Sequence, residues 1–135
     1  MRNSLKKMII ATIILASSFG CKKISAPNEE SKKIFGSWSY DSNFGGNAGT
    51  GESKRFKNDT WVEFTEKGYF KVYLGSKKQS QKQFKIKMVE TIYDASHRPA
   101  IYYVNGDFET YQISHDTLYL SDEIYDGYTY RFIKK

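Results

Sequence analysis

Cysteine, histidine and proline are scarce in this chain of 135 residues, which has one Cys, two His and two Pro. A single cysteine excludes a framework of disulfides, and one Cys with two His leaves too few ligands for a structural zinc site. Aromatic residues, in contrast, make up 16% of the sequence. Disordered chains lack that much apolar surface, so we expect a folded domain. The length fits one domain, because domains most often have roughly 100–150 residues.

A long hydrophobic run occurs only once, near the N-terminus. Lys6 and Lys7 end a basic segment, the apolar run 8–16 follows, and mostly small residues then lead to Cys21. This order is typical of a secretory signal peptide, and the run is shorter than the roughly 20 apolar residues that a transmembrane helix needs. A buried core helix is the alternative, but the adjoining lysines argue against it. We therefore predict that residues 1–20 are a signal peptide.

The only cysteine follows Gly20 at the end of this signal peptide. The arrangement resembles the lipobox of bacterial lipoproteins, in which the cysteine becomes the lipidated first residue of the mature protein. The resemblance implies that Cys21 carries a lipid anchor in the membrane, that residues 21–33 form a polar tether, and that residues 34–135 form the domain. It also implies the cell envelope of a Gram-negative bacterium, and the two lysines after the cysteine favour the periplasmic face of the outer membrane. Ordinary secretion with a free thiol is the alternative.

The net charge of +6 includes three basic residues of the signal peptide. Without them, 18 basic residues face 15 acidic ones, and the charge falls to about +3. Eight of these basic residues gather at 54–57 and 77–87, where interleaved aromatic residues would also suit single-stranded nucleic acid. An exported lipoprotein seldom meets nucleic acid, so we predict no nucleic-acid binding. We expect a solvated outer face, with attraction to anionic headgroups or to an acidic partner as the alternative.

From Ile34 onward, apolar and polar residues alternate with a period of two, which is typical of half-buried β-strands. Asn105-Gly106 indicates a hairpin, because a type I′ turn needs positive φ at both central residues. Short turns and the need to remove exposed edges predict an all-β fold, an eight-stranded antiparallel up-and-down β-barrel preceded by a short helical turn. A two-sheet sandwich is the alternative. The predicted strands span residues 35–41, 60–65, 69–74, 83–91, 100–104, 107–113, 117–121 and 128–133.

The triplet Gly36-Ser37-Trp38 directly follows the predicted helical turn and resembles the start of the first strand in lipocalins. With the aromatic hairpin over residues 111–132, the chain resembles the lipocalin-like domains of small bacterial lipoproteins, which are calycin-type β-barrels. The resemblance implies that Trp38 closes one end of the barrel. It also implies that Arg131 from the last strand stacks across this tryptophan.

The barrel interior is the predicted binding site. Eight strands enclose a space just wide enough to hold one small ligand or to be filled by side chains. We expect a membrane-anchored protein that binds a small lipophilic or aromatic molecule. The alternative is a protein-interaction, inhibitor or envelope-structural module with a filled barrel, no ligand and an envelope protein as partner. The residues predicted to contact a ligand are Tyr40, Phe64, Phe70, Val72, Phe84, Ile86, Met88, Tyr111 and Tyr130.

The glycine-rich stretch over residues 43–53 nearly contains a phosphate-binding P-loop. Gly46, Gly51 and Ser53 have the right spacing, but Glu52 stands where the motif needs lysine, and predicted strands flank the loop on both sides. A carboxylate there would repel phosphates, so we exclude nucleotide binding. We expect either a loop over the open end of the barrel or a disordered insertion.

The sequence shows no catalytic pattern. No serine lies in a Gly-x-Ser-x-Gly elbow, and His97 and His115 fall in predicted turns. The acids over residues 122–126 lack the spacing of a calcium loop, so we expect a solvated turn. We therefore predict that the protein is not an enzyme and has no cofactor and no metal. Thr117 lies in a short sequence that resembles a bacterial O-glycosylation acceptor, and its modification stays open.

Overall fold

The computed structural model describes residues 29–46 and 53–135. The predicted signal peptide, the predicted lipid site Cys21 and the first part of the tether lie outside the described residues. In the described ranges, no helix has the length and apolar character needed to cross a membrane.

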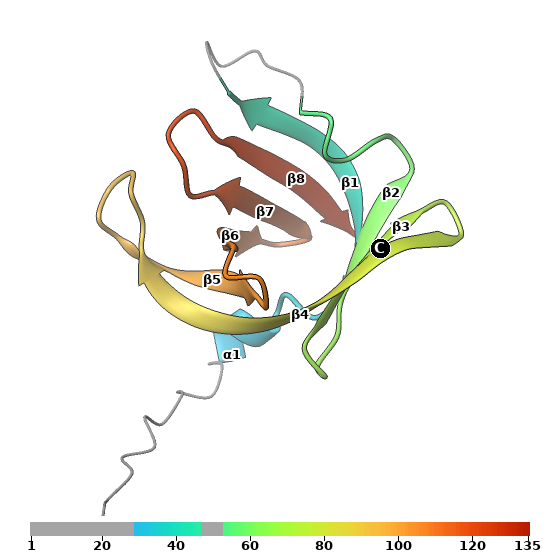
Figure 1. Ribbon diagram of the computed structural model, residues 1–135, viewed down its shortest axis with the longest axis horizontal. Helices are drawn as coiled ribbons and strands as arrows, with labels where there is room; N and C mark the ends of the chain where they lie inside the picture. The colour runs from blue at the N-terminus through green and yellow to red at the C-terminus, as the bar shows by residue number, and fades with distance from the viewer. Residues whose placement is uncertain (1–28, 47–52) are drawn as a thin grey trace, which may run out of the picture.

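Eight antiparallel strands form a closed barrel in which each strand pairs with its neighbours in the chain and the last strand returns to the first (Figure 1). This architecture confirms the predicted fold class and excludes the sandwich. The elements are α1 (Glu29–Lys32), β1 (Gly36–Gly45), β2 (Thr60–Phe64), β3 (Tyr69–Leu74), β4 (Lys77–Glu90), β5 (His97–Tyr103), β6 (Phe108–Ser114), β7 (Thr117–Asp122) and β8 (Tyr128–Lys134).

The short helix α1 and the residues after it cover one end of the barrel, which we call the closed end and define by Ile34, Trp38 and Lys134 (Figure 1). Ile34 is fully buried, and its carbonyl oxygen accepts a 2.7 Å hydrogen bond from the indole nitrogen of Trp38. Lys134 lies opposite Trp38 in the β1–β8 ladder. The closed end therefore joins the start of β1 to the end of β8.

The long strand β4 curves around the barrel (Figure 1). Its first half pairs with β3 and its second half pairs with β5. It begins at Lys77, six residues before the predicted start at residue 83, so the predicted start of this strand is wrong. The polar run 77–82 shows no alternation from which a strand could be predicted. Its inward positions hold Ser80 and Lys82, which stand opposite Val72 and Phe70. Polar residues thus occupy positions at which alternation predicts apolar ones.

The β5 strand also begins earlier than predicted, at His97, and Pro99 lies within it opposite Met88. The turn after β5 is a hairpin as predicted, but its type is not I′. Only Gly106 has a positive φ (90°), and the amide of Tyr103 donates to the carbonyl of Asp107 at 2.9 Å. Three residues therefore form the loop, with glycine in the left-handed position that such hairpins require.

Side chains fill the interior next to the closed end. Trp38, Phe64 and Phe132 are at most 1% exposed. The ring of Phe64 packs against the rings of Phe70 and Phe84, with centroids 4.8 and 5.5 Å away. This half of the barrel therefore has the dense packing of an ordinary hydrophobic core.

Candidate functional site

The segment 53–59 crosses the other end of the barrel, which we call the open end. Phe56 of this segment is only 6% exposed, and its ring contacts the rings of Tyr130 and Phe132 with centroids 5.1 and 5.2 Å away. The hydroxyl groups of Ser53 and Tyr130 lie 2.9 Å apart, which ties the segment to β8. Sequence analysis missed this interior residue, because no apolar alternation surrounds Phe56.

A charged network lies directly above Phe56. The guanidinium of Arg55 donates two parallel hydrogen bonds to the carboxylate of Glu109, of which the Nη2–Oε2 bond is 2.9 Å long. The hydroxyl of Tyr103 donates a 2.6 Å hydrogen bond to the same carboxylate. Glu109 is only 4% exposed, whereas one third of the Arg55 side chain is exposed. A bidentate pair of this kind fixes both side chains and so sets the shape of the open end.

The surroundings shift the pKa values of three groups in this network. Burial opposes the charge of Arg55, but the hydrogen bonds and charge of Glu109 raise the guanidinium pKa above its ordinary value. Burial, followed by the negative charge of Glu109, raises the pKa of Tyr103 well above its ordinary range. Burial also raises the pKa of Asp122, whose carboxylate oxygen lies 3.5 Å from Arg55. The tyrosine therefore stays protonated and donates to Glu109 at neutral pH.

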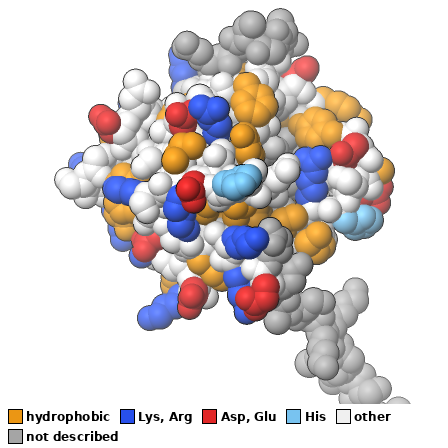
Figure 2. Space-filling view, turned by 180° about the vertical axis from the view of Figure 1, so that it is seen from behind, with side chains coloured by type: hydrophobic (Ala, Val, Ile, Leu, Met, Phe, Trp, Pro, Cys, Tyr) orange, Lys and Arg blue, Asp and Glu red, His pale blue; other side chains and the backbone are white. Residues whose placement is uncertain are grey.

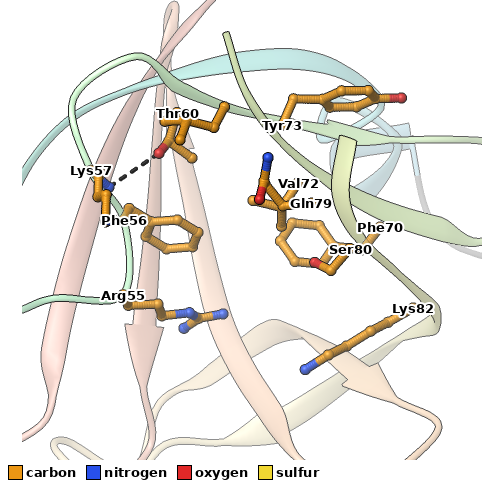
Figure 3. Close-up of a pocket in the computed structure, with 11 residues that line it drawn as sticks. Arg55, Phe56, Lys57, Thr60, Phe70, Val72, Tyr73, Gln79, Ser80 and Lys82 are labelled. Carbon is orange, nitrogen blue, oxygen red and sulfur yellow. Dashed lines mark hydrogen bonds between the residues drawn. The ribbon is translucent and has the colours of Figure 1, made fainter. Parts of the chain in front are cut away.

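Lys82 enters the same region from β4. Its ammonium lies 5.3 Å from the centre of the Tyr103 ring, and within the described residues it forms no ion pair. Figure 3 shows the side chains of Arg55 and Lys82 pointing toward one another from two sides of a pocket. Lys82 therefore presents an exposed ammonium without an ion pair among the described residues at the open end.

The pocket between the segment 53–59 and strands β3 and β4 has a volume of about 330 Å³. The side chains of Phe56, Phe70 and Val72 form its apolar part, and Arg55 and Lys82 form its cationic edge (Figure 3). A second, more polar pocket of about 540 Å³ shares Arg55 and Lys82 and is bounded by acidic side chains of β6 and β7. The open end thus offers an amphipathic cavity rather than a purely apolar one.

Two of the nine residues predicted to contact a ligand, Phe70 and Val72, line the 330 Å³ pocket. Tyr111 borders a separate hollow of about 420 Å³ between β5 and β6. Met88 is 55% exposed near the far end of β4, so the prediction that its side chain lies inside the barrel is wrong. The other predicted residues pack in or against the core, namely Tyr40, Phe64, Phe84, Ile86 and Tyr130.

The predicted contact between Trp38 and Arg131 does not form. Trp38 is buried at the closed end as expected, but the ammonium of Lys134 lies over its ring, 4.2 Å from the centroid. Arg131 stands between two buried residues of β8 and therefore turns outward, where it forms an ion pair with Asp41 at 2.5 Å. Lys134 lies on the same face of β8 as the buried Tyr130 and Phe132, whereas Arg131 lies on the opposite face.

The remaining polar residues that sequence analysis singled out lie apart. His97 and His115 are exposed on different turns or strand ends. The acidic turn is not simply solvated, because Glu123 accepts hydrogen bonds from the Ile92 amide (3.1 Å) and the Thr110 hydroxyl (2.5 Å). No three His, Cys, Asp or Glu side chains gather at metal-binding distances within residues 29–46 and 53–135.

On the face of the molecule seen in Figure 2, the basic residues do not form a single field. Figure 2 shows Lys, Arg, Asp and Glu side chains interspersed over one face of the molecule. On the outer wall, Lys87 lies 4.5 Å from the centre of the Tyr102 ring, and Lys71 pairs with Glu63 at 3.0 Å. The inward Lys82 therefore differs from the other lysines of strands β3 and β4.

A scan against protein-family models, a search of curated proteins and a search of solved structures each found no match. What the structure establishes is therefore the closed eight-stranded antiparallel barrel, an architecture consistent with the calycin-type fold.

Proposed function

We propose that the protein binds one small molecule at the open end of its barrel while a lipid on Cys21 holds it to the membrane of a bacterial envelope. The observation that carries the binding proposal is the pocket of about 330 Å³ beside Phe56, Phe70 and Val72. This volume lies at the lower end of the roughly 300–1,000 Å³ that ligand clefts occupy. The ligand is therefore small, with an apolar or aromatic body.

The depth of the site follows from the packing beneath it. Phe56 closes the interior from above, and Trp38, Phe64 and Phe132 fill the space below. The ligand therefore rests on Phe56 and Phe70 near the surface instead of entering a deep chamber. Contact with water at one side suits a molecule that has both an apolar part and a polar part.

Fluorescence of the uncharged dye N-phenyl-1-naphthylamine tests the binding proposal, because its emission rises in apolar surroundings. We expect the purified full chain to bind the dye and Val72→Trp to weaken binding at least about tenfold by filling the pocket. Lys85→Trp, which places the same indole on the exposed outer face of β4, is the matched control and retains binding. Equal binding by the two variants, or no binding by the parent chain, contradicts the proposal.

The lipid anchor has a separate test in cells. Cys21→Ala removes the only thiol to which the lipid can attach. We expect the variant to leave the membrane fraction and the parent chain to remain in it. A variant that is processed and membrane-bound like the parent contradicts the anchor.

A second function, interaction with an envelope protein, is favoured by exposed apolar side chains on two adjacent loops. Ile124 and Tyr125 are 62% and 84% exposed, next to Ile92 and Tyr93, which are 43% and 53% exposed. The Tyr93 hydroxyl contacts the carbonyl of Ile124 at 2.9 Å and holds the loops together. An ordered apolar patch of this kind is typical of protein-binding surfaces.

Photocrosslinking in cells tests this second function. A crosslinker at position 125 should give one discrete product that Ile92→Asp removes, whereas a crosslinker at the exposed Gln112 of β6 should not give it. Products that are identical from positions 125 and 112, or absent from both, contradict a partner at this patch.

A further inference from the structure

Like Ser80, Lys82 lines the 330 Å³ pocket at a position where alternation predicts an apolar residue. It stands opposite the buried Phe70 in the β3–β4 ladder and two residues before the buried Phe84, so it faces inward. Its side chain is nevertheless exposed, so the ammonium stays hydrated at the rim of the pocket and is not buried inside it. Within the described residues Lys82 has only the ring of Tyr103, 5.3 Å away.

The charges around the pocket are unequal. Its described lining includes the cationic residues Arg55, Lys57 and Lys82 and no Asp or Glu. Arg55 is already neutralised by the bidentate pair with Glu109, which lies on the far side of its guanidinium. Lys82 shares the neighbouring 540 Å³ pocket with acidic side chains, but among the described residues it forms no ion pair with them, so an acidic group of a ligand can pair with it.

The apolar part of the pocket begins within the reach of Lys82. Phe56 and Phe70 present ring surface beside it, and the pocket continues past Val72 toward the end of β3 (Figure 3). A single molecule can thus contact the ammonium at one end and the rings at the other. A purely polar anion would leave the rings uncovered, and a purely apolar molecule would leave the lysine unpaired.

We infer that the ligand is an anionic amphiphile, a molecule with one acidic group and an apolar body, and that Lys82 binds its acidic group. This inference rests on the proposed function, since it names the class of molecule that the same pocket takes. Arg55, held in place by Glu109, contributes to the binding of the acidic group. The rings of Phe56 and Phe70 contact the apolar body of the ligand.

Two dyes that share an anilinonaphthalene body test the inference on the full chain. 1-Anilinonaphthalene-8-sulfonate carries an acidic group that N-phenyl-1-naphthylamine lacks. We expect the sulfonate dye to bind at least about tenfold more tightly, as charge-assisted contacts allow. Lys82→Gln should remove that preference and change the binding of the neutral dye by less than about twofold, since only the charge contact is lost.

Two further variants separate charge from folding. Lys82→Arg keeps the positive charge and should retain the preference for the sulfonate dye. Lys85→Gln removes the same charge from the exposed outer face of β4 and should leave both dyes unchanged. Dye that binds elsewhere on the chain contributes equally to the signal of every variant, so comparison among the variants removes this contribution. Equal melting temperatures of the Gln variants show that Lys82→Gln acts on the ligand.

The outcomes separate this inference from the proposed function. If both dyes bind equally and Lys82→Gln changes neither, the inference is overturned and small-molecule binding stands. If neither dye binds, both proposals are overturned. Competition then identifies the body of the ligand: displacement by dodecanoate at lower concentration than 2-naphthoate indicates an acyl chain, and the reverse indicates an aromatic ring. Displacement by neither contradicts recognition of a carboxylate amphiphile.

Discussion

The two ends of this barrel use similar residue types for opposite purposes. At the closed end, Lys134 lies over the ring of Trp38 and donates a 2.8 Å hydrogen bond to the carbonyl of Phe35. At the open end, Lys82 approaches an aromatic ring as well, but it borders a pocket and has no acceptor among the described residues. The Lys134 ammonium is therefore held by an acceptor of the protein, whereas the Lys82 ammonium is available to a ligand of the pocket.

We expect the closed end to contribute more to the free energy of unfolding than the open end. Trp38→Ala should lower the free energy of unfolding by about 3–5 kcal/mol, because it leaves a large cavity and removes the hydrogen bond to Ile34. Urea unfolding measures this loss. Trp61→Ala on the outer wall, where the indole stacks on Tyr73, is the control and should cost clearly less. Equal losses would show that the closed end has no special role.

The charged network should give the next largest effect. Glu109→Gln leaves Arg55 without its carboxylate, and we expect a loss of about 2 kcal/mol, less than for a fully buried pair because one third of the Arg55 side chain is exposed. A double-mutant cycle with Arg55→Met measures the coupling. Strictly additive losses in the two single variants would contradict a functional ion pair.

The closed-end lysine is expected to matter more than the arginine of the same strand. Lys134→Met should cost about 1 kcal/mol, since it loses both the Trp38 ring and the Phe35 carbonyl. Arg131→Met should cost about 0.5 kcal/mol, because its ion pair with Asp41 is largely exposed. Thermal unfolding of both variants decides the order, and the reverse order would contradict a stabilising role of Lys134 at the closed end.

The smallest effect is a difference in pH dependence at the open end. Because the folded protein raises the pKa of Tyr103, the unfolded chain releases this proton first, and stability falls as the pH rises above about 10. Tyr103→Phe should lack this part of the decline. Tyr119→Phe on the outer face of β7 is the control and should keep it. Parallel pH profiles for the parent and Tyr103→Phe would contradict the assigned shift.

The alternation of apolar residues was sufficient to predict the fold, because each strand has one buried and one solvated face. It predicted Phe70 and Val72 for the same reason, and both line the pocket. Alternation says nothing about a residue such as Phe56, which reaches the interior from a connection without regular structure.

The polar contacts were harder to predict from the sequence. The partners Arg55 and Glu109 are 54 positions apart, and only barrel closure brings them together. Lys82 was concealed by a polar run in which inward and outward residues look alike. Parity along β8, by contrast, already distinguished Lys134 from Arg131, since Tyr130 and Phe132 on either side of the arginine are buried.

The central claim is that ligands bind the open end and that the closed end is only structural. Backbone amide NMR of the full chain during titration with 1-anilinonaphthalene-8-sulfonate tests it most directly. We predict shifts concentrated at Phe56, Phe70, Val72 and Lys82, with the amides of Trp38 and Lys134 unmoved. Shifts concentrated at the closed end, or spread evenly over the barrel, would contradict the account.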